Sequence, residues 1–160
     1  MSSRSLAYLL KHANLRLSEL MGPALEPCGI DGREFGVLSV LGGSEPLSQL
    51  EAAQRMGIDR TTMVAMVDGL ERKGLVGRRP HPADRRKNIV EPTERGREVL
   101  AEALRVVAAA EAEFLAPLPD GDARLLRDAL ERLIPRTQAA EPPSGVPAPM
   151  PVPSPSWPAR

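Results

Sequence analysis

The stretch GIDRTTMVAMVDGLERKGLVGRRPHPADRRKNIVEPTERG, residues 57–96, decides the fold of this chain. In its first half, apolar residues recur at spacings of three and four, which is typical of one buried helix face. They are Met63, Met66, Val67 and Leu70. Asp59 stands where an N-cap residue belongs, and Gly74 follows the last turn. We therefore expect a helix that begins near Arg60 and stops before Gly74.

The second half of the stretch predicts a β-hairpin. LVGRR (75–79) and KNIVE (87–91) are strand-forming runs around the turn-forming PHPAD (80–84), and Pro92 should end the second strand. Four bases lie within and around the second run: Arg85, Arg86, Lys87 and Arg95. The whole chain has 21 Lys and Arg residues against 21 Asp and Glu residues. A balanced total still permits a basic patch, so the placement of these bases matters more than the sum.

A second short helix precedes this stretch. In SQLEAAQRMG (48–57), Ser48 and Glu51 have the spacing of a capping box, and Gly57 ends the run. Two short helices joined by a tight turn that contains glycine indicate a helix-turn-helix, whose second helix is the recognition helix. The hairpin that follows is then a wing.

Another helix is expected within DGREFGVLSVLGG (31–43). Asp31 and Glu34 repeat the capping-box spacing, and the pair Gly42–Gly43 stops the helix. Its buried stripe is Phe35, Leu38 and Leu41.

Longer amphipathic helices are expected towards both ends. The first has a weak point or an end at Gly22–Pro23, and its apolar face is Leu6, Leu9, Leu10, Ala13, Leu17, Leu20 and Met21. A second begins at Thr93 and is broken by Pro117; its apolar residues are Val99, Leu100, Ala103, Leu104, Val107 and Phe114. Asp120 or Asp122 is expected to cap a last helix with Leu125, Leu126, Ala129, Leu130, Leu133 and Ile134.

Composition divides the 160 residues into a domain, 1–135, and a tail, 136–160. The tail holds eight of the 17 prolines without an apolar period, so we expect it to be disordered or polyproline II. No signal-peptide core and no apolar run of about 20 residues is present, so a cytoplasmic location without membrane contact is expected. The separated His12 and His81 and the single Cys28 give no metal-ligand spacing, and we expect no metal and no cofactor.

At this point the sequence resembles the MarR-type (multiple antibiotic resistance) winged-helix transcription regulators, from residue 5 to about 134. Residues 57–96 carry the most specific part: the recognition helix, the Leu-Val strand start, the Asp-x-Arg wing and the Thr-x-x-Gly helix start. Pro92 replaces the usual Leu, and Leu50 and Ala52 look interchanged in the supporting helix, which should alter its packing.

The resemblance implies a mainly α fold with six helices, a two- or three-stranded wing and an intertwined homodimer. Its dimerisation helices would be 3–26, 93–116 and 120–135, and its DNA-binding lobe would be 31–91. The sequence pattern agrees with a dimer. In so small a domain the apolar faces of the terminal helices have too little surface to pack against unless a second copy of the chain supplies it.

Candidate DNA contacts begin on the recognition helix. Thr61, Thr62 and Ala65 face away from its apolar stripe and allow close approach to the major groove, while Arg60 is the strongest candidate for a guanine or phosphate. Ser48 opens the supporting helix. The resemblance places Arg86 in the minor groove with Asp84 orienting it. The remaining wing candidates, for phosphates, are Arg78, Arg79, Arg85 and Lys87.

We therefore predict a sequence-specific, double-stranded DNA-binding regulator, a repressor that binds a pseudopalindromic operator as a homodimer. The resemblance puts a pocket between the first, second and fifth helices, where His12, Arg16 and Phe35 are candidates for binding a small anionic aromatic effector. Two alternatives stay open: an architectural or protein-interaction winged helix without ligand response, and a thiol-based redox sensor using Cys28. An enzyme is not expected, because no nucleophile–base pair, phosphate loop or carboxylate constellation is recognisable.

Overall fold

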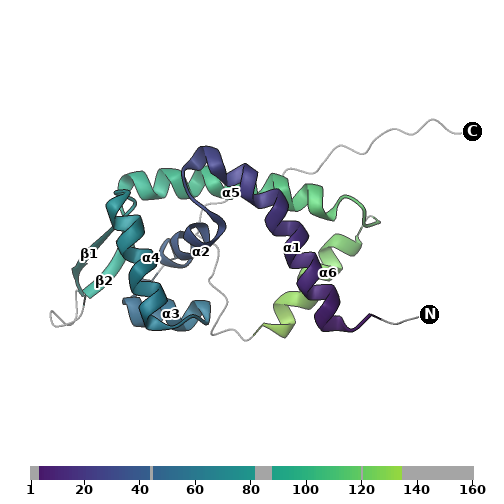
Figure 1. Cartoon of the computed structure of the whole chain (residues 1–160), viewed down its shortest axis with the longest axis horizontal. Coiled ribbons are helices and arrows are strands. Elements are labelled where there is room, and N and C mark those ends of the chain that lie inside the picture. The colour runs from purple at the N-terminus through teal and green to yellow at the C-terminus, as the bar shows by residue number, and fades with distance from the viewer. Residues whose placement is uncertain (1–3, 44, 82–87, 120, 135–160) are drawn as a thin grey trace, which may run out of the picture.

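The computed structural model describes residues 4–43, 45–81, 88–119 and 121–134. Its elements, in order, are α1 (Leu6–Leu25), the 3-10 helix η1 (Glu26–Cys28), α2 (Gly32–Leu41), α3 (Gln49–Met56), α4 (Arg60–Arg72), β1 (Val76–Pro80), β2 (Asn88–Pro92), α5 (Glu94–Leu115) and α6 (Asp122–Leu133). Helix α5 spans the molecule; the hairpin lies at one end of it, and α1 and α6 lie towards the other (Figure 1). The predicted fold class, a mainly helical winged helix-turn-helix, is confirmed.

Side-chain caps begin most of these helices, as the sequence predicts. Both bonds of the capping box are present at Asp31 and at Ser48, and Thr93 accepts from the N–H of Gly96. The prediction for α6 is wrong: its N-cap is Gly121, with no side-chain bond, and Asp122 is its first helical residue. Gly121 has a φ of 93°, which favours glycine, and the turn is closed by the backbone instead (Asp122 N–H to the Pro119 carbonyl, 3.1 Å). Asp120 lies outside the described residues.

Helix α1 does not end at the Gly22–Pro23 pair. It runs on to Leu25, with Pro23 inside its last turn. Proline removes one backbone hydrogen bond and crowds the preceding turn. Leu25 is fully buried, and burying a leucine contributes about 1.5–3 kcal/mol, which helps to offset that loss.

The wing is an antiparallel pair in which Val76 lies opposite Pro92 and Pro80 lies opposite Asn88. Both strands begin one residue later than predicted, and Pro92 ends β2 as expected. Val90 also donates its N–H to the carbonyl of Leu47 (2.9 Å), which adds a one-residue bridge beside the two strands. This bridge ties the wing to the segment that enters α3.

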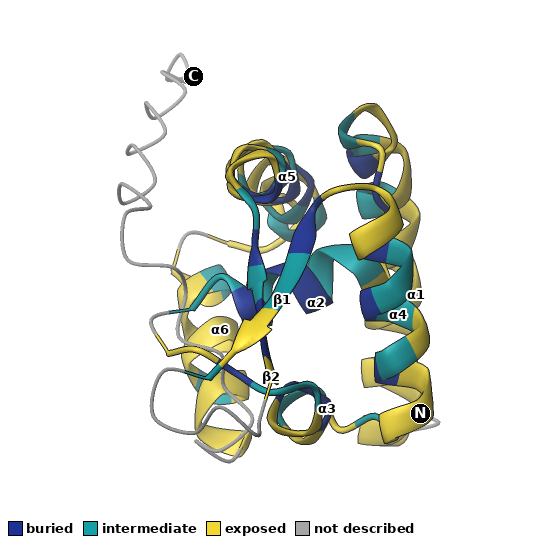
Figure 2. Cartoon of the chain, turned by 90° about the vertical axis from the view of Figure 1, so that its left-hand side faces the viewer, coloured by how far each residue is buried: buried dark blue, intermediate teal, exposed yellow. Residues whose placement is uncertain are grey.

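The core lies in the lobe made by α2, α3, α4, the hairpin and the first part of α5, where Figure 2 shows the buried segments meeting. Its largest fully buried side chains are Leu25, Leu38, Met63, Leu70 and Ile89. At the interchanged positions of α3, Ala52 is fully buried while Leu50 is 50% exposed. In contrast, α6 buries none of its residues.

No helix within the described ranges is both long and apolar enough to cross a bilayer. The predicted boundaries of the dimerisation and DNA-binding parts stay predictions.

Candidate nucleic-acid interface

The helix-turn-helix is held by caps at both of its helices. Ser48 donates its hydroxyl to Glu51 Oε2 (2.7 Å) and accepts from the N–H of Glu51 (3.3 Å). Gly57 then turns the chain with a φ of 65°, a left-handed conformation that suits glycine. The Ser48 hydroxyl is therefore committed to the start of α3, although Ser48 itself is only half-buried.

Helix α4 presents the predicted small and polar face to the outside. Arg60, Thr61, Thr62 and Ala65 are exposed, whereas its buried residues are Met63, Val67 and Leu70. The N-terminal end of a helix carries partial positive charge, which favours an anion such as a DNA phosphate beside this exposed first turn.

Asp59 caps α4 and also engages Thr62. The carboxylate accepts from the N–H of Thr62 (2.9 Å) and from its hydroxyl (2.5 Å). These bonds from Thr62 are the main reason that the pKa of Asp59 lies below its usual range. Because the Thr62 hydroxyl proton is donated to Asp59, this hydroxyl can only accept a hydrogen bond from a DNA base.

Two of the arginines expected to contact phosphate, Arg78 and Arg79, are paired with carboxylates of the chain. The Arg78 guanidinium on β1 bonds to Asp68 and to Glu71, one turn apart on α4. Arg79 makes a two-pronged contact with Glu91, at 2.5 Å from Nε and 2.6 Å from Nη2. This contact, through the hydrogen bond from Arg79, holds the pKa of Glu91 below its usual range.

Sequence reasoning missed these three carboxylates. Residues 77, 79, 89 and 91 share one face of the hairpin in the observed register, so Arg79 and Glu91 are diagonal neighbours. The alternation of the two strands is the signal that could have found this pair. No comparable local signal joins Arg78 to α4.

The wing-tip candidates Asp84, Arg85, Arg86 and Lys87 lie outside the described residues. The pair Pro80–Asn88 is the last pair of the strand ladder on the side of the tip, and the description stops at His81 and resumes at Asn88.

The three effector candidates make separate contacts. His12 contacts Tyr8 with ring centroids 4.1 Å apart and the rings tilted by 42°, and Arg4 lies over the same tyrosine ring. Arg16 is exposed and pairs with Glu19 (3.2 Å). Phe35 packs half-buried against the core. Within the described ranges, no three His, Cys, Asp or Glu side chains cluster as metal ligands would.

Cys28 is half-buried in η1, at the turn after α1. Burial raises the pKa of its thiol, the nearby Glu102 raises it further, and Arg105 opposes them only in part. A raised pKa keeps the thiol protonated at neutral pH, which is the less reactive form.

Comparison with known proteins agrees with this architecture. Residues 29–87 match the sequence pattern of the MarR family. The helix-turn-helix transcriptional repressor Rv2887 of Mycobacterium tuberculosis is 33% identical over 128 residues, which is 80% of this chain and 92% of that protein. Two solved structures are also similar. The repressor CouR bound to a 23-mer DNA duplex has a TM-score of 0.74 at 35% identity, over 81% of this chain and 92% of that one. CouR from Rhodococcus jostii RHA1 bound to p-coumaroyl-CoA has a TM-score of 0.71 at 32% identity, over 82% and 95%.

The likeness to Rv2887 and CouR extends over about four fifths of this chain, well beyond residues 29–87. Because sequence identity and fold agree over that length, the chain belongs to the MarR family of DNA-binding transcriptional regulators.

Proposed function

We propose that this regulator is a homodimeric repressor that binds a pseudopalindromic operator. The observation that carries the proposal is the exposed N-terminal part of α4, where Arg60, Thr61 and Ala65 are presented on a capped helix beside the hairpin. In this arrangement α4 enters the major groove, and Arg60 contacts a guanine or a phosphate at the groove edge. Ala65 offers no hydrogen bond, so the sequence preference rests partly on DNA shape.

The wing supplies the second contact in this proposal. Arg86 enters the minor groove with Asp84 beside it, and Arg85 and Lys87 meet the phosphates on either side. Arg79 can bind a phosphate only if its ion pair with Glu91 breaks. Arg78 can do so only if it releases Asp68 and Glu71 on α4. The net positive charge offered to DNA therefore comes mainly from the wing tip and from Arg60.

A second copy of the chain accounts for the uncovered apolar surface at the end far from the hairpin (Figure 1). Helix α6 buries none of its residues, and α1 buries only Leu25. The exposed apolar side chains of the two helices include Leu6, Leu9, Leu10, Leu125, Leu126 and Leu133. Several exposed leucines on neighbouring helices of a small protein are characteristic of an interface between subunits. The dimer sets its two recognition helices about 34 Å apart, one DNA turn.

Release from DNA by a small anionic aromatic effector completes the proposal. CouR was solved with p-coumaroyl-CoA, which is an aromatic and anionic ligand, and this supports the ligand class. The effector would favour a spacing of the two lobes that no longer fits the operator. His12, Arg16 and Phe35 remain the proposed contacts.

One series of measurements tests these points. Selection from random duplexes should return a pseudopalindrome, and light scattering should give twice the monomer mass. Phenolic acids and their CoA thioesters are then added to the complex in a mobility-shift assay. Absence of preference for any duplex at modest ionic strength would refute the proposal. Binding that no such ligand reverses would favour an architectural role.

A further inference from the structure

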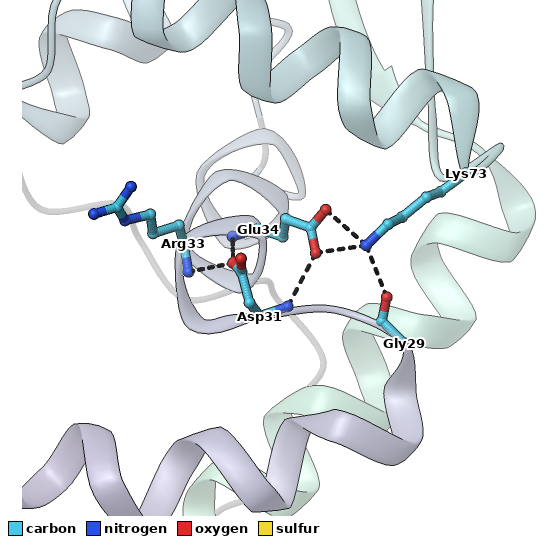
Figure 3. A network of polar contacts seen from close by, with 5 residues as sticks. All are labelled: Gly29, Asp31, Arg33, Glu34 and Lys73. Carbon is cyan, nitrogen blue, oxygen red and sulfur yellow. Dashed lines mark hydrogen bonds and ion pairs between the residues drawn. The ribbon is translucent and has the colours of Figure 1, made fainter.

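Lys73, the residue after the last turn of α4, makes a set of contacts that DNA binding as proposed above does not use. Its backbone N–H closes the helix on the carbonyl of Gly69 (3.2 Å). Its ammonium group lies 2.7 Å from Glu34 Oε1, 2.8 Å from Glu34 Oε2 and 2.9 Å from the carbonyl oxygen of Gly29 (Figure 3). These partners are 39 and 44 residues away in the chain, so the contacts are tertiary.

The side chain of Glu34 is held in place by a second hydrogen bond. The same Oε2 accepts the N–H of Asp31 (3.0 Å), which is one half of the α2 capping box (Figure 3). The Glu34 side chain is only 17% exposed, so water competes weakly for its carboxylate. Gly29 lies in the turn between η1 and α2 with a φ of 71°. Lys73 therefore joins the end of the recognition helix to the start of α2 and to the turn that leaves α1.

The ammonium group is engaged by protein oxygens on two sides, which distinguishes Lys73 from a lysine aimed at phosphate. A cation at this position also complements the negative C-terminal end of α4. The geometry suits a fixed link between two elements better than a contact with a ligand.

We infer that Lys73 is a positioning residue of the DNA-reading unit, which holds the recognition helix in register with the α1–α2 turn through Glu34 and Gly29. This inference rests on the proposed function. In the proposed dimer α1 lies at the subunit interface. The contacts of Lys73 with Glu34 and Gly29 therefore couple the orientation of α4 to the arrangement of the two subunits. Loss of the contact frees one end of α4 relative to that interface while the core beneath it stays intact.

The test compares Lys73→Met, Glu34→Gln, their double variant and Lys73→Arg in the full-length protein. Glu34→Gln keeps an oxygen for the α2 cap but removes the charge. The matched control is Arg33→Met, because only the backbone N–H of Arg33 bonds to Asp31, and its side chain points away from Lys73 (Figure 3). Operator binding is measured over a salt series, at a temperature where circular dichroism shows each variant folded.

Lys73→Met and Glu34→Gln should each weaken operator binding by about tenfold. The double variant should be no weaker than the single ones, and Lys73→Arg and Arg33→Met should stay near the wild type. Each weakened variant should also lose discrimination between the operator and versions with one base pair added or removed between the half-sites. A loss of fold stability alone would not change that spacing preference.

Four results would overturn the inference: wild-type affinity in both single variants, additive losses in the double variant, an unchanged spacing preference, or a salt slope for Lys73→Met smaller by about one unit. The last would mark Lys73 as a direct phosphate contact. Failure of the wild type itself to select any duplex would instead refute the proposed function.

Discussion

Arg78 on β1 is ion-paired with Asp68 on α4, so the base of the wing is joined to the recognition helix by a charge pair. Glu71, on the next turn of the same helix, binds the same guanidinium. Two carboxylates would otherwise stand uncompensated on the helix that approaches DNA. Arg78 neutralises them and holds the wing against α4 at the same time.

Replacing Arg78 should therefore weaken binding to every duplex. Arg78→Met leaves Asp68 and Glu71 without their cation, and like charges facing the phosphates cost affinity. We expect a loss of about tenfold for operator and random DNA alike, measured by fluorescence anisotropy at fixed salt. The double variant Asp68→Asn, Glu71→Gln releases Arg78 and should bind random DNA more tightly than the wild type. Unchanged random-DNA binding in both variants would show that this charge set does not act on DNA.

Removal of the wing-tip arginine should have a different signature. Arg86→Ala should weaken operator binding by at least about tenfold at fixed salt, because a guanidinium in a narrow minor groove meets concentrated negative potential. The loss should be larger on operators with A·T pairs beneath the wing. Arg33→Ala, which also removes one exposed positive charge from the lobe, is the control. Equal titration curves for Arg86→Ala and the wild type would refute the minor-groove role.

Local patterns predicted most of the lobe. The caps at Asp31, Ser48 and Asp59 involve residues two or three positions away, so the sequence shows both partners at once. The buried face of α4 was also predictable, because Met63 and Val67 follow the helix period. Chemistry within one turn is what a single sequence shows most clearly.

Tertiary pairs were out of reach for the same reason. The partners of Arg78 and of Lys73 lie between seven and 44 residues away, and only the folded chain brings them together. Sequence reasoning consequently took Arg78 for an uncommitted phosphate ligand and gave Lys73 no role, whereas the pairing of Arg79 with Glu91 was within reach of the strand alternation. The wing tip and the effector candidates remain predictions.

Acid should loosen the start of the recognition helix through Asp59. The pKa of this carboxyl is lowered by its bonds from Thr62, so the folded state binds the proton less readily than the unfolded state. Its contribution to stability is complete above the usual aspartate pKa of about 3.9 and is lost as the pH falls through the lower folded value. Asp59→Asn should reduce the stability difference between pH 6 and pH 3, measured by urea unfolding. An identical pH dependence in the variant would contradict this assignment.

Cys28 should react slowly with alkylating reagents at neutral pH, because burial and Glu102 raise the pKa of its thiol. Operator binding should be the same before and after mild peroxide, and the same in Cys28→Ser. Mass spectrometry of the treated protein measures modification directly. Peroxide-sensitive binding that Cys28→Ser abolishes would restore the redox-sensor alternative.

Gly96, in the first turn of α5, should tolerate no side chain. A Cβ placed there would lie 1.9 Å from the carbonyl oxygen of Leu75, and that atom is backbone rather than a flexible side-chain end. The N–H of Thr93 bonds to the same carbonyl (3.0 Å), so the first turn of α5 packs directly against the residue that precedes β1. Gly96→Ala must therefore displace α5 from the lobe, at a cost of about 3 kcal/mol or more in the free energy of unfolding.

Gly32→Ala provides the matched control for Gly96→Ala. It is also the same change in the first turn of a helix, but a Cβ at Gly32 meets nothing within 4 Å. It should leave the urea midpoint unchanged or raise it slightly, since alanine loses less backbone entropy on folding. Because α5 connects the lobe to α6 and so to the proposed dimer interface, Gly96→Ala should also reduce operator affinity where the protein is still folded. Equal urea midpoints for the two variants would show that α5 does not depend on this close approach.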